Sequence, residues 1–246
     1  MRGHRITRIG KTLLGAISWC CLLLSAGQAW AQQAPSDTMP ERAAPCFACH
    51  GKEGRASGDG SFPRIAGKPA GYLYNQLVNF RDGRRKNAQM RYMIGFMSDQ
   101  NLHEFADYFA SLHPPYPEPQ APKLSPSELE RGRMLVTQGD KARNIPACTA
   151  CHGERLTGTQ PSIPGLAGLT RDYLAWQFGS WKDGHRGAAA PDCMARIAQG
   201  LTQQDIGAAT AWIASQPLPG DMSAAPAGSI KPPIACGSYN EKASKP

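Results

Sequence analysis

Two segments of the chain share one spacing of cysteine and histidine, Cys46-Phe47-Ala48-Cys49-His50 and Cys148-Thr149-Ala150-Cys151-His152. Two cysteines separated by two residues can form thioether bonds with the two vinyl groups of one haem, and the histidine that follows is then placed to bind the iron. The spacing therefore predicts two covalently bound haem c groups. The predicted attachment residues are Cys46, Cys49, Cys148 and Cys151, and the predicted proximal ligands are His50 and His152.

The same cysteine spacing occurs in zinc knuckles and in redox dithiols. Zinc would need a second pair of Cys or His residues close by, and a thioredoxin-like dithiol would need a strand before it and a helix after it. The sequence around both segments offers neither context. Haem is the better interpretation of both.

The sixth ligand of each iron must come from another part of the chain, as methionine, as histidine or as an open position. Met194 is the only methionine between the second motif and the last predicted helix, and Met90 lies at the matching place after the first motif. We therefore predict Met90 and Met194 as ligands, with Met93 the main rival of Met90 and Met97 a further candidate. Methionines three and four residues apart also fit a helical core. The spare histidines, interpreted as surface residues, are His103, His113 and His185.

An internal repeat places the two motifs in equivalent surroundings. Cys46 and Cys148 are 102 residues apart, and several later segments recur at similar offsets in the same order. The matching segments are 63–67 with 164–168 and 72–85 with 173–186, both at an offset of 101, and Met90 with Met194 at 104. A near-constant offset indicates a duplicated domain. We call residues 32–113 the first copy and residues 125–217 the second copy.

Each copy is expected to consist of helices joined by long loops. Apolar periodicity predicts helices over 72–80 and 99–112, and again over 173–181 and 203–215. A capping-box spacing from Ser125 to Glu128, with Pro126 at the first helical position, predicts another helix that runs to about Gln138. No convincing alternating strand pattern occurs. The expected fold class is all-α, with two tandem domains joined by a proline-rich linker (114–124) and followed by a C-terminal tail (218–246).

The first 31 residues have the pattern of a secretory signal. Four basic residues and no acid precede an apolar run, which is shorter than the ~20 residues of a membrane-spanning helix and ends before Ala29-Trp30-Ala31. We expect cleavage after Ala31 and an exported mature chain; a retained membrane anchor is the weaker interpretation. Cleavage lowers the formal net charge from +8 to +4, and four propionates would largely cancel the remainder. The basic precursor is thus no argument for nucleic-acid binding.

Together these motifs resemble the dihaem cytochromes of the c4 type, which contain two class I cytochrome c domains. The resemblance covers both copies through Cys-x-x-Cys-His-Gly, Pro-x-x-Ala-Gly, Tyr-Leu-x-x-Gln, Asp-Gly-x-Arg and the methionine. It implies two cytochrome c-like all-α domains, His/Met ligation and electron transfer in the periplasm. It also implies that the carbonyls of Pro63 and Pro164 accept the proximal histidine N–H, and that Arg85 and Arg186 lie near propionates. For each arginine, a solvated loop charge is the alternative.

The chain departs from that pattern at two places. Residues 32–45 contain three prolines, so the N-terminal helix of the first copy should be short or missing. The tail carries Cys236, and Cys193 directly precedes Met194. In an oxidising compartment these two remaining cysteines predict a disulfide, with free thiols as the alternative.

These features favour an electron carrier over an enzyme, because His/Met ligation raises the reduction potential and leaves no open coordination position. We expect single electrons to pass from a quinol-oxidising complex or a dehydrogenase to a terminal oxidase. The expected partners are redox proteins, with no nucleic acid, no small-molecule substrate, no catalytic side chain, and membrane association through partners only. The alternatives are the cytochrome subunit of a larger dehydrogenase, and a dihaem peroxidase or thiosulfate dehydrogenase with one open or Cys/His-ligated iron.

Overall fold

The computed structural model describes residues 37–57 and 61–239. The predicted signal segment, residues 1–31, lies outside this part. The chain forms two compact units, residues 1–41 and 42–246. In the first unit the described residues are 37–41, where the carboxylate of Glu41 accepts hydrogen bonds from the backbone N–H and the hydroxyl of Thr38, at 3.3 and 2.8 Å. These residues include the first turn of helix α2.

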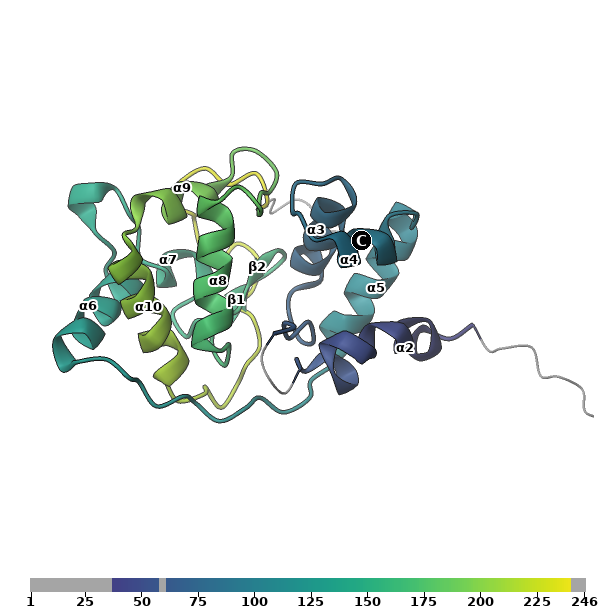
Figure 1. The fold of residues 1–246 in the computed structure, drawn as a ribbon, viewed down its shortest axis with the longest axis horizontal. Coiled ribbons are helices and arrows are strands. Elements are labelled where there is room, and N and C mark those ends of the chain that lie inside the picture. The colour runs from purple at the N-terminus through teal and green to yellow at the C-terminus, as the bar shows by residue number, and fades with distance from the viewer. Residues whose placement is uncertain (1–36, 58–60, 240–246) are drawn as a thin grey trace, which may run out of the picture. The chain divides into compact units, whose positions relative to one another are not determined.

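The first copy contains four α-helices and one short 3₁₀ helix among its described residues. They are α2 (Met39–His50), η1 (Lys52–Gly54), α3 (Ala70–Arg81), α4 (Ala88–Ile94) and α5 (Asp99–Ser111). Helices α3 and α5 pack against each other, and α4 lies beside α3 (Figure 1). Phe80, Ile94 and Leu102, one from each of these three helices, form a buried cluster, in which Leu102 is 0% exposed.

The second copy repeats the motif helix and the three α-helices that follow it; it adds a helix and a 3₁₀ turn before the motif and two short strands after it. Its elements are α6 (Pro126–Thr137), η2 (Lys141–Arg143), α7 (Thr149–His152), β1 (Gly158–Thr159), β2 (Ile163–Pro164), α8 (Arg171–Lys182), α9 (Cys193–Gly200) and α10 (Gln203–Ser215). Helix α10 packs against α6 and α8 (Figure 1). Gly132 permits the close approach of α6 and α10, because a Cβ there would lie 2.2 Å from the carbonyl oxygen of Ala208.

The all-α fold class predicted from the sequence is confirmed. Around α6 the capping box forms: Ser125 Oγ accepts from the N–H of Glu128, and the Glu128 carboxylate accepts from the N–H of Ser125 at 2.9 Å. Strands β1 and β2 pair antiparallel but hold two residues each, which is too short for an alternating pattern to be read from the sequence. Only residues 39–45 of α2 precede Cys46, so the helix before the first haem motif is short.

The proline-rich linker is extended and is held by one arginine of the first copy. The guanidinium of Arg64 donates to the carbonyl oxygens of Pro114 and Pro115, at 2.5 and 3.0 Å. It also lies 3.7 Å from the centre of the Tyr116 ring. Within the described residues, no helix is both long and apolar enough to cross a membrane.

Candidate haem sites

The second Cys-x-x-Cys-His motif lies at α7, where His152 is the last helical residue and is 8% exposed. The Nδ1 atom of His152 is 2.8 Å from the carbonyl oxygen of Pro164. Because a carbonyl can only accept, Nδ1 carries the proton, and the lone pair of Nε2 is free to bind a metal. Burial lowers the pKa of His152, although the hydrogen bond to Pro164 acts the other way. The neutral ring that binds iron is therefore favoured.

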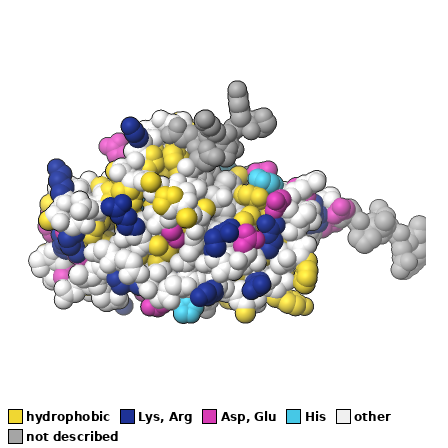
Figure 2. Space-filling model, turned by 90° about the horizontal axis from the view of Figure 1, so that it is seen from above, with side chains coloured by type: hydrophobic (Ala, Val, Ile, Leu, Met, Phe, Trp, Pro, Cys, Tyr) yellow, Lys and Arg dark blue, Asp and Glu magenta, His cyan; other side chains and the backbone are white. Residues whose placement is uncertain are grey.

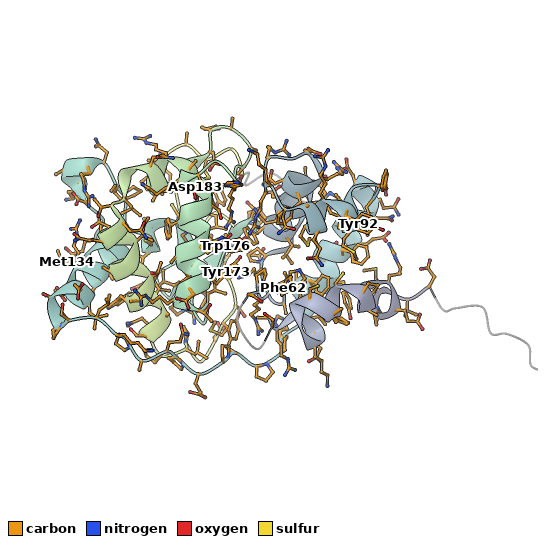
Figure 3. The ribbon with its side chains drawn as sticks, viewed as in Figure 1. Phe62, Tyr92, Met134, Tyr173, Trp176 and Asp183 are labelled. Carbon is orange, nitrogen blue, oxygen red and sulfur yellow. A yellow bond between two sulfur atoms is a disulfide. The ribbon has the colours of Figure 1, made fainter. Side chains whose placement is uncertain are left out.

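A largely apolar cavity surrounds this motif. Cys148, Cys151, His152 and Met194 all line it. Its apolar walls include Leu174 and Phe178 of α8 and Ile213 of α10, and Tyr173 of α8, labelled in Figure 3, also lines it. Two thiols, one imidazole and one thioether sulfur thus face a single apolar space. These groups and this lining fit a covalently attached haem.

Burial favours the neutral thiol at three cysteines of the motifs, Cys46, Cys148 and Cys151. Burial raises the pKa of Cys148 to about 12 and also raises the pKa of Cys46 and Cys151. A metal-binding or nucleophilic cysteine needs a thiolate, which a lowered pKa favours. The surroundings of these three cysteines instead favour the neutral, protonated thiol, which suits uncharged thioether links.

The first motif has the same local geometry at the end of α2. His50 is the last residue of the helix, is 8% exposed, and has its Nδ1 atom 2.9 Å from the carbonyl oxygen of Pro63. The ring of Phe62, labelled in Figure 3, meets the His50 ring edge-on at 6.2 Å between centres. Gln89, at the start of α4, lies with its Nε2 atom 3.7 Å from Cys49 Sγ. The beginning of α4 is therefore beside the first haem motif.

The methionines in and just after α4 differ in their surroundings. Met90 is partly buried against the cluster of Phe80, Ile94 and Leu102, and its N–H donates to Asn87 Oδ1 at 2.9 Å. Met93 is 41% exposed, whereas Met97 packs against the same cluster as Met90. Packing therefore favours Met90 or Met97 over Met93, and the internal repeat favours Met90.

Two arginines and two glutamines join the copies. Arg85 donates to the side-chain oxygens of Gln76 and Gln177, at 2.7 and 2.8 Å. Arg186 donates to the same two oxygens, and its Nη2 atom also lies 3.2 Å from the hydroxyl of Tyr72. Gln76 and Gln177 occupy equivalent places in the repeat, as do the two arginines. Each arginine therefore contacts both copies, and neither is a freely solvated loop charge.

The C-terminal tail covers the cavity of the second motif. Cys193 and Cys236 form a disulfide, which ties the tail to the start of α9. Pro232 and Ile234 line the cavity, and Ser162 Oγ donates to the carbonyl oxygen of Ser238 at 2.7 Å. The tail is thus part of the wall around the second site.

Some of these residues were not anticipated from the sequence. Gln76 and Gln177 are signalled by their matching places in the repeat, although their shared hydrogen bonds are not. Lys68 lines the cavity around the second motif, but the repeat has a leucine, Leu169, at the equivalent position. The repeat therefore gives no signal for a role of Lys68. The three spare histidines His103, His113 and His185 are exposed.

Comparisons with known proteins place the chain in a family. No protein-family profile matches it. It is 36% identical over 195 residues to a protein of Thiomonas intermedia named thiosulfate dehydrogenase electron acceptor, covering 79% of this chain and 89% of that one. It is 32% identical over 204 residues to cytochrome c4 of Pseudomonas aeruginosa, covering 82% and 95%. The crystal structure of reduced cytochrome c4 from Pseudomonas stutzeri matches with a TM-score of 0.61 and 29% identity, covering 71% and 95%.

The likeness extends over 95% of the Pseudomonas aeruginosa and Pseudomonas stutzeri proteins. In this chain, each Cys-x-x-Cys-His motif is followed by a proline whose carbonyl accepts from the motif histidine. The two-haem expectation and the resemblance stated from the sequence are both confirmed. The chain therefore belongs to the cytochrome c4 family of electron-transfer proteins and carries two covalently bound haem c groups.

Proposed function

We propose that this cytochrome is a periplasmic carrier that accepts single electrons from a thiosulfate-oxidising dehydrogenase and delivers them to a terminal oxidase. Of the donor classes expected from the sequence, a dehydrogenase is favoured by the relative from Thiomonas intermedia, whose name describes it as the electron acceptor of such an enzyme. The observation that carries the role of a carrier is that His152 and Met194 line the same apolar cavity. A haem attached at Cys148 and Cys151 could take both of its protein ligands from these two residues.

The roles of the site residues belong to the same proposal. Haem is attached at Cys46 and Cys49 in the first copy and at Cys148 and Cys151 in the second. The iron of the first haem would be held by His50 and Met90, and that of the second by His152 and Met194. The carbonyls of Pro63 and Pro164 fix the histidine rings, and Arg85 and Arg186 lie near propionates. Residues 32–113 and 125–217 act as two domains, exported by a signal that is cleaved after Ala31.

The protein groups set the conditions for a one-electron change at each iron, which is the chemistry that bound haem supplies. The hydrogen bonds from His50 to Pro63 and from His152 to Pro164 hold each ring in one orientation and keep Nε2 unprotonated. The apolar walls around the second motif would disfavour the more highly charged ferric state of a haem held there.

The surface charge is consistent with transient protein partners. On the face shown in Figure 2, Lys and Arg side chains are interspersed with Asp, Glu and hydrophobic side chains rather than gathered into one basic area. Trp176 of α8 and Tyr92 of α4, both labelled in Figure 3, are 57% and 81% exposed. Exposed aromatic side chains between mixed charges are typical of protein–protein contacts.

The proposal is tested by mixing the oxidised mature protein with a thiosulfate dehydrogenase and thiosulfate in a stopped-flow spectrometer. We expect rapid reduction of both haems, dependent on thiosulfate, and reoxidation when a terminal oxidase is added. Reduction by a quinol-oxidising complex is the comparison. If that complex reduces the protein and the dehydrogenase does not, the proposed donor is wrong. Peroxidase activity, or a complex with the dehydrogenase that does not dissociate, would instead support the alternatives stated from the sequence.

A further inference from the structure

Lys68 belongs to the first copy but lines the cavity around the second haem motif. It lies in the loop that joins η1 to α3, and it is buried, at 7% exposed. The Nζ atom lies 3.4 Å from the carbonyl oxygen of Gly165, the residue that follows Pro164. Among the described residues, this long hydrogen bond to a neutral carbonyl is the one polar contact of the ammonium.

The charges around Lys68 do not balance. The charge of Lys68 interacts with three titratable groups, Tyr72, Arg64 and Arg186. It also lies close enough to His152 to lower the pKa of that histidine. No Asp or Glu of the described residues forms an ion pair with Lys68. A buried ammonium without an anion is unfavourable, because it has lost its hydration and gained no counter-charge. Burial lowers the pKa of Lys68 to about 8, as expected for a cation that lacks a partner.

The haem bound at Cys148 and Cys151 brings carboxylates to this cavity. A haem carries two propionates, and a neighbouring ammonium is a suitable partner for either. The repeat shows that this arrangement belongs to one site alone: the position equivalent to Lys68 is Leu169, which is buried in the apolar cluster of the second copy. The first haem therefore has no lysine at the corresponding place.

We propose that Lys68 is a haem-binding residue that acts across the copies, its ammonium pairing with a propionate of the second haem. The inference goes beyond the family assignment and does not depend on the proposed donor. A positive charge near an iron opposes the ferric state more than the ferrous state, because the ferric state carries one more positive charge. Lys68 therefore raises the reduction potential of the second haem and helps to make the two haems unequal.

The test compares Lys68→Met, which removes the charge, with Lys68→Arg, which keeps it. Each holoprotein is titrated spectroelectrochemically, and the haem methyl resonances of the ferric protein identify which haem is oxidised at each potential. We expect Lys68→Met to lower the potential of the second haem and leave the first unchanged, and Lys68→Arg to keep most of the wild-type value. Lys123→Met, at an exposed lysine of the linker, is the control for net charge.

An unchanged second potential in Lys68→Met would overturn the proposal, as would a lowered potential of equal size in Lys68→Arg. A shift confined to the first haem would also overturn it. If Lys68→Met does not yield folded holoprotein, Lys68→Gln replaces it, because the amide keeps a donor for Gly165 but carries no charge. As an independent readout, the carbon resonances of isotopically labelled propionates should change in the second haem of the neutral variant. Unchanged propionate resonances would contradict the pairing.

Discussion

Cys193, the residue immediately before Met194, forms a disulfide with Cys236 of the tail. The disulfide therefore fixes the tail next to the methionine of the second site. Asn75 and Ser162 hold the same tail by donating to the carbonyl oxygen of Ser238, at 3.1 and 2.7 Å. The tail is thus attached to both copies where it lines the cavity. We interpret it as a cover that keeps water from the second haem.

Removing the disulfide should weaken the second site. In the double variant Cys193→Ser/Cys236→Ser, the link across 43 residues is lost. We expect the free energy of unfolding to fall by about 2–4 kcal/mol, because the unfolded chain gains conformational freedom. Guanidinium unfolding of the holoprotein, followed by haem absorbance, measures this. Ser162→Ala, which removes one hydrogen bond to the tail, should cost about 1 kcal/mol. Equal unfolding midpoints for the double variant and the wild type would contradict the expectation.

Asp205 should make the second copy less stable at low pH. Burial alone would raise the pKa of its carboxyl, but hydrogen bonds from Arg143, Thr202 and Arg131 hold the pKa well below its usual range. A lowered folded-state pKa stabilises the fold above the unfolded value of about 4, and this stability is lost as the pH falls toward the folded value. The contribution is therefore complete at pH 7.

The matching experiment is urea unfolding of Asp205→Asn at neutral and acid pH. We expect a loss of about 2–3 kcal/mol at neutral pH, since charge-assisted hydrogen bonds to two arginines are weakened. The difference from the wild type should shrink as the pH falls below about 4. Asp107→Asn, at an exposed aspartate of α5, is the control and should change little. A deficit that does not depend on pH would show that the carboxylate charge is not the cause.

Local signals predicted much of this structure, because caps and apolar periodicity act over a few residues. The spacing from Ser125 to Glu128 located the start of α6, and the periodic segment at 203–215 is α10. The second site followed from the same kind of evidence. The offset of the repeat aligned Met194 with Met90 and so predicted it as a ligand. In the structure, Met194 and His152 line one cavity.

Contacts between distant segments could not be predicted in this way. Lys68 reaches Gly165 across 97 residues, and no local pattern marks a lysine as buried. The tail segment around Ile234 has neither helical nor strand periodicity, yet it lines the second cavity. Such features depend on how the copies and the tail pack, and the sequence of one chain does not encode that packing as a short pattern.

The shared glutamine oxygens should stabilise the contact between the copies. Gln177→Leu removes the acceptor that Arg85 Nη2 and Arg186 Nη1 share, while the hydrogen bonds of both arginines to Gln76 remain. The Nη1 group of Arg186, which is 7% exposed, then loses its acceptor. We expect a loss of about 2–3 kcal/mol in the free energy of unfolding and faster proteolysis in the linker. Gln76→Leu is the matched variant and should cost less, because Gln76 is only partly buried whereas Gln177 is 5% exposed. A larger loss in the free energy of unfolding for Gln76→Leu than for Gln177→Leu would contradict this view of the contact.

The methionine ligands are tested by the near-infrared band that a methionine–ferric haem bond produces. Met194→Ala and Met90→Ala should each remove about half of its intensity and lower the potential of one haem, because a thioether ligand favours the ferrous state. Met93→Ala is the matched control on α4 and should keep the whole band, since Met93 is 41% exposed and lies outside the buried cluster. Loss of half the band in Met93→Ala, with none in Met90→Ala, would assign the first haem to Met93. A wild-type band of only half the two-haem intensity would mean that one iron lacks methionine, and the enzymatic alternatives would then be favoured over the carrier.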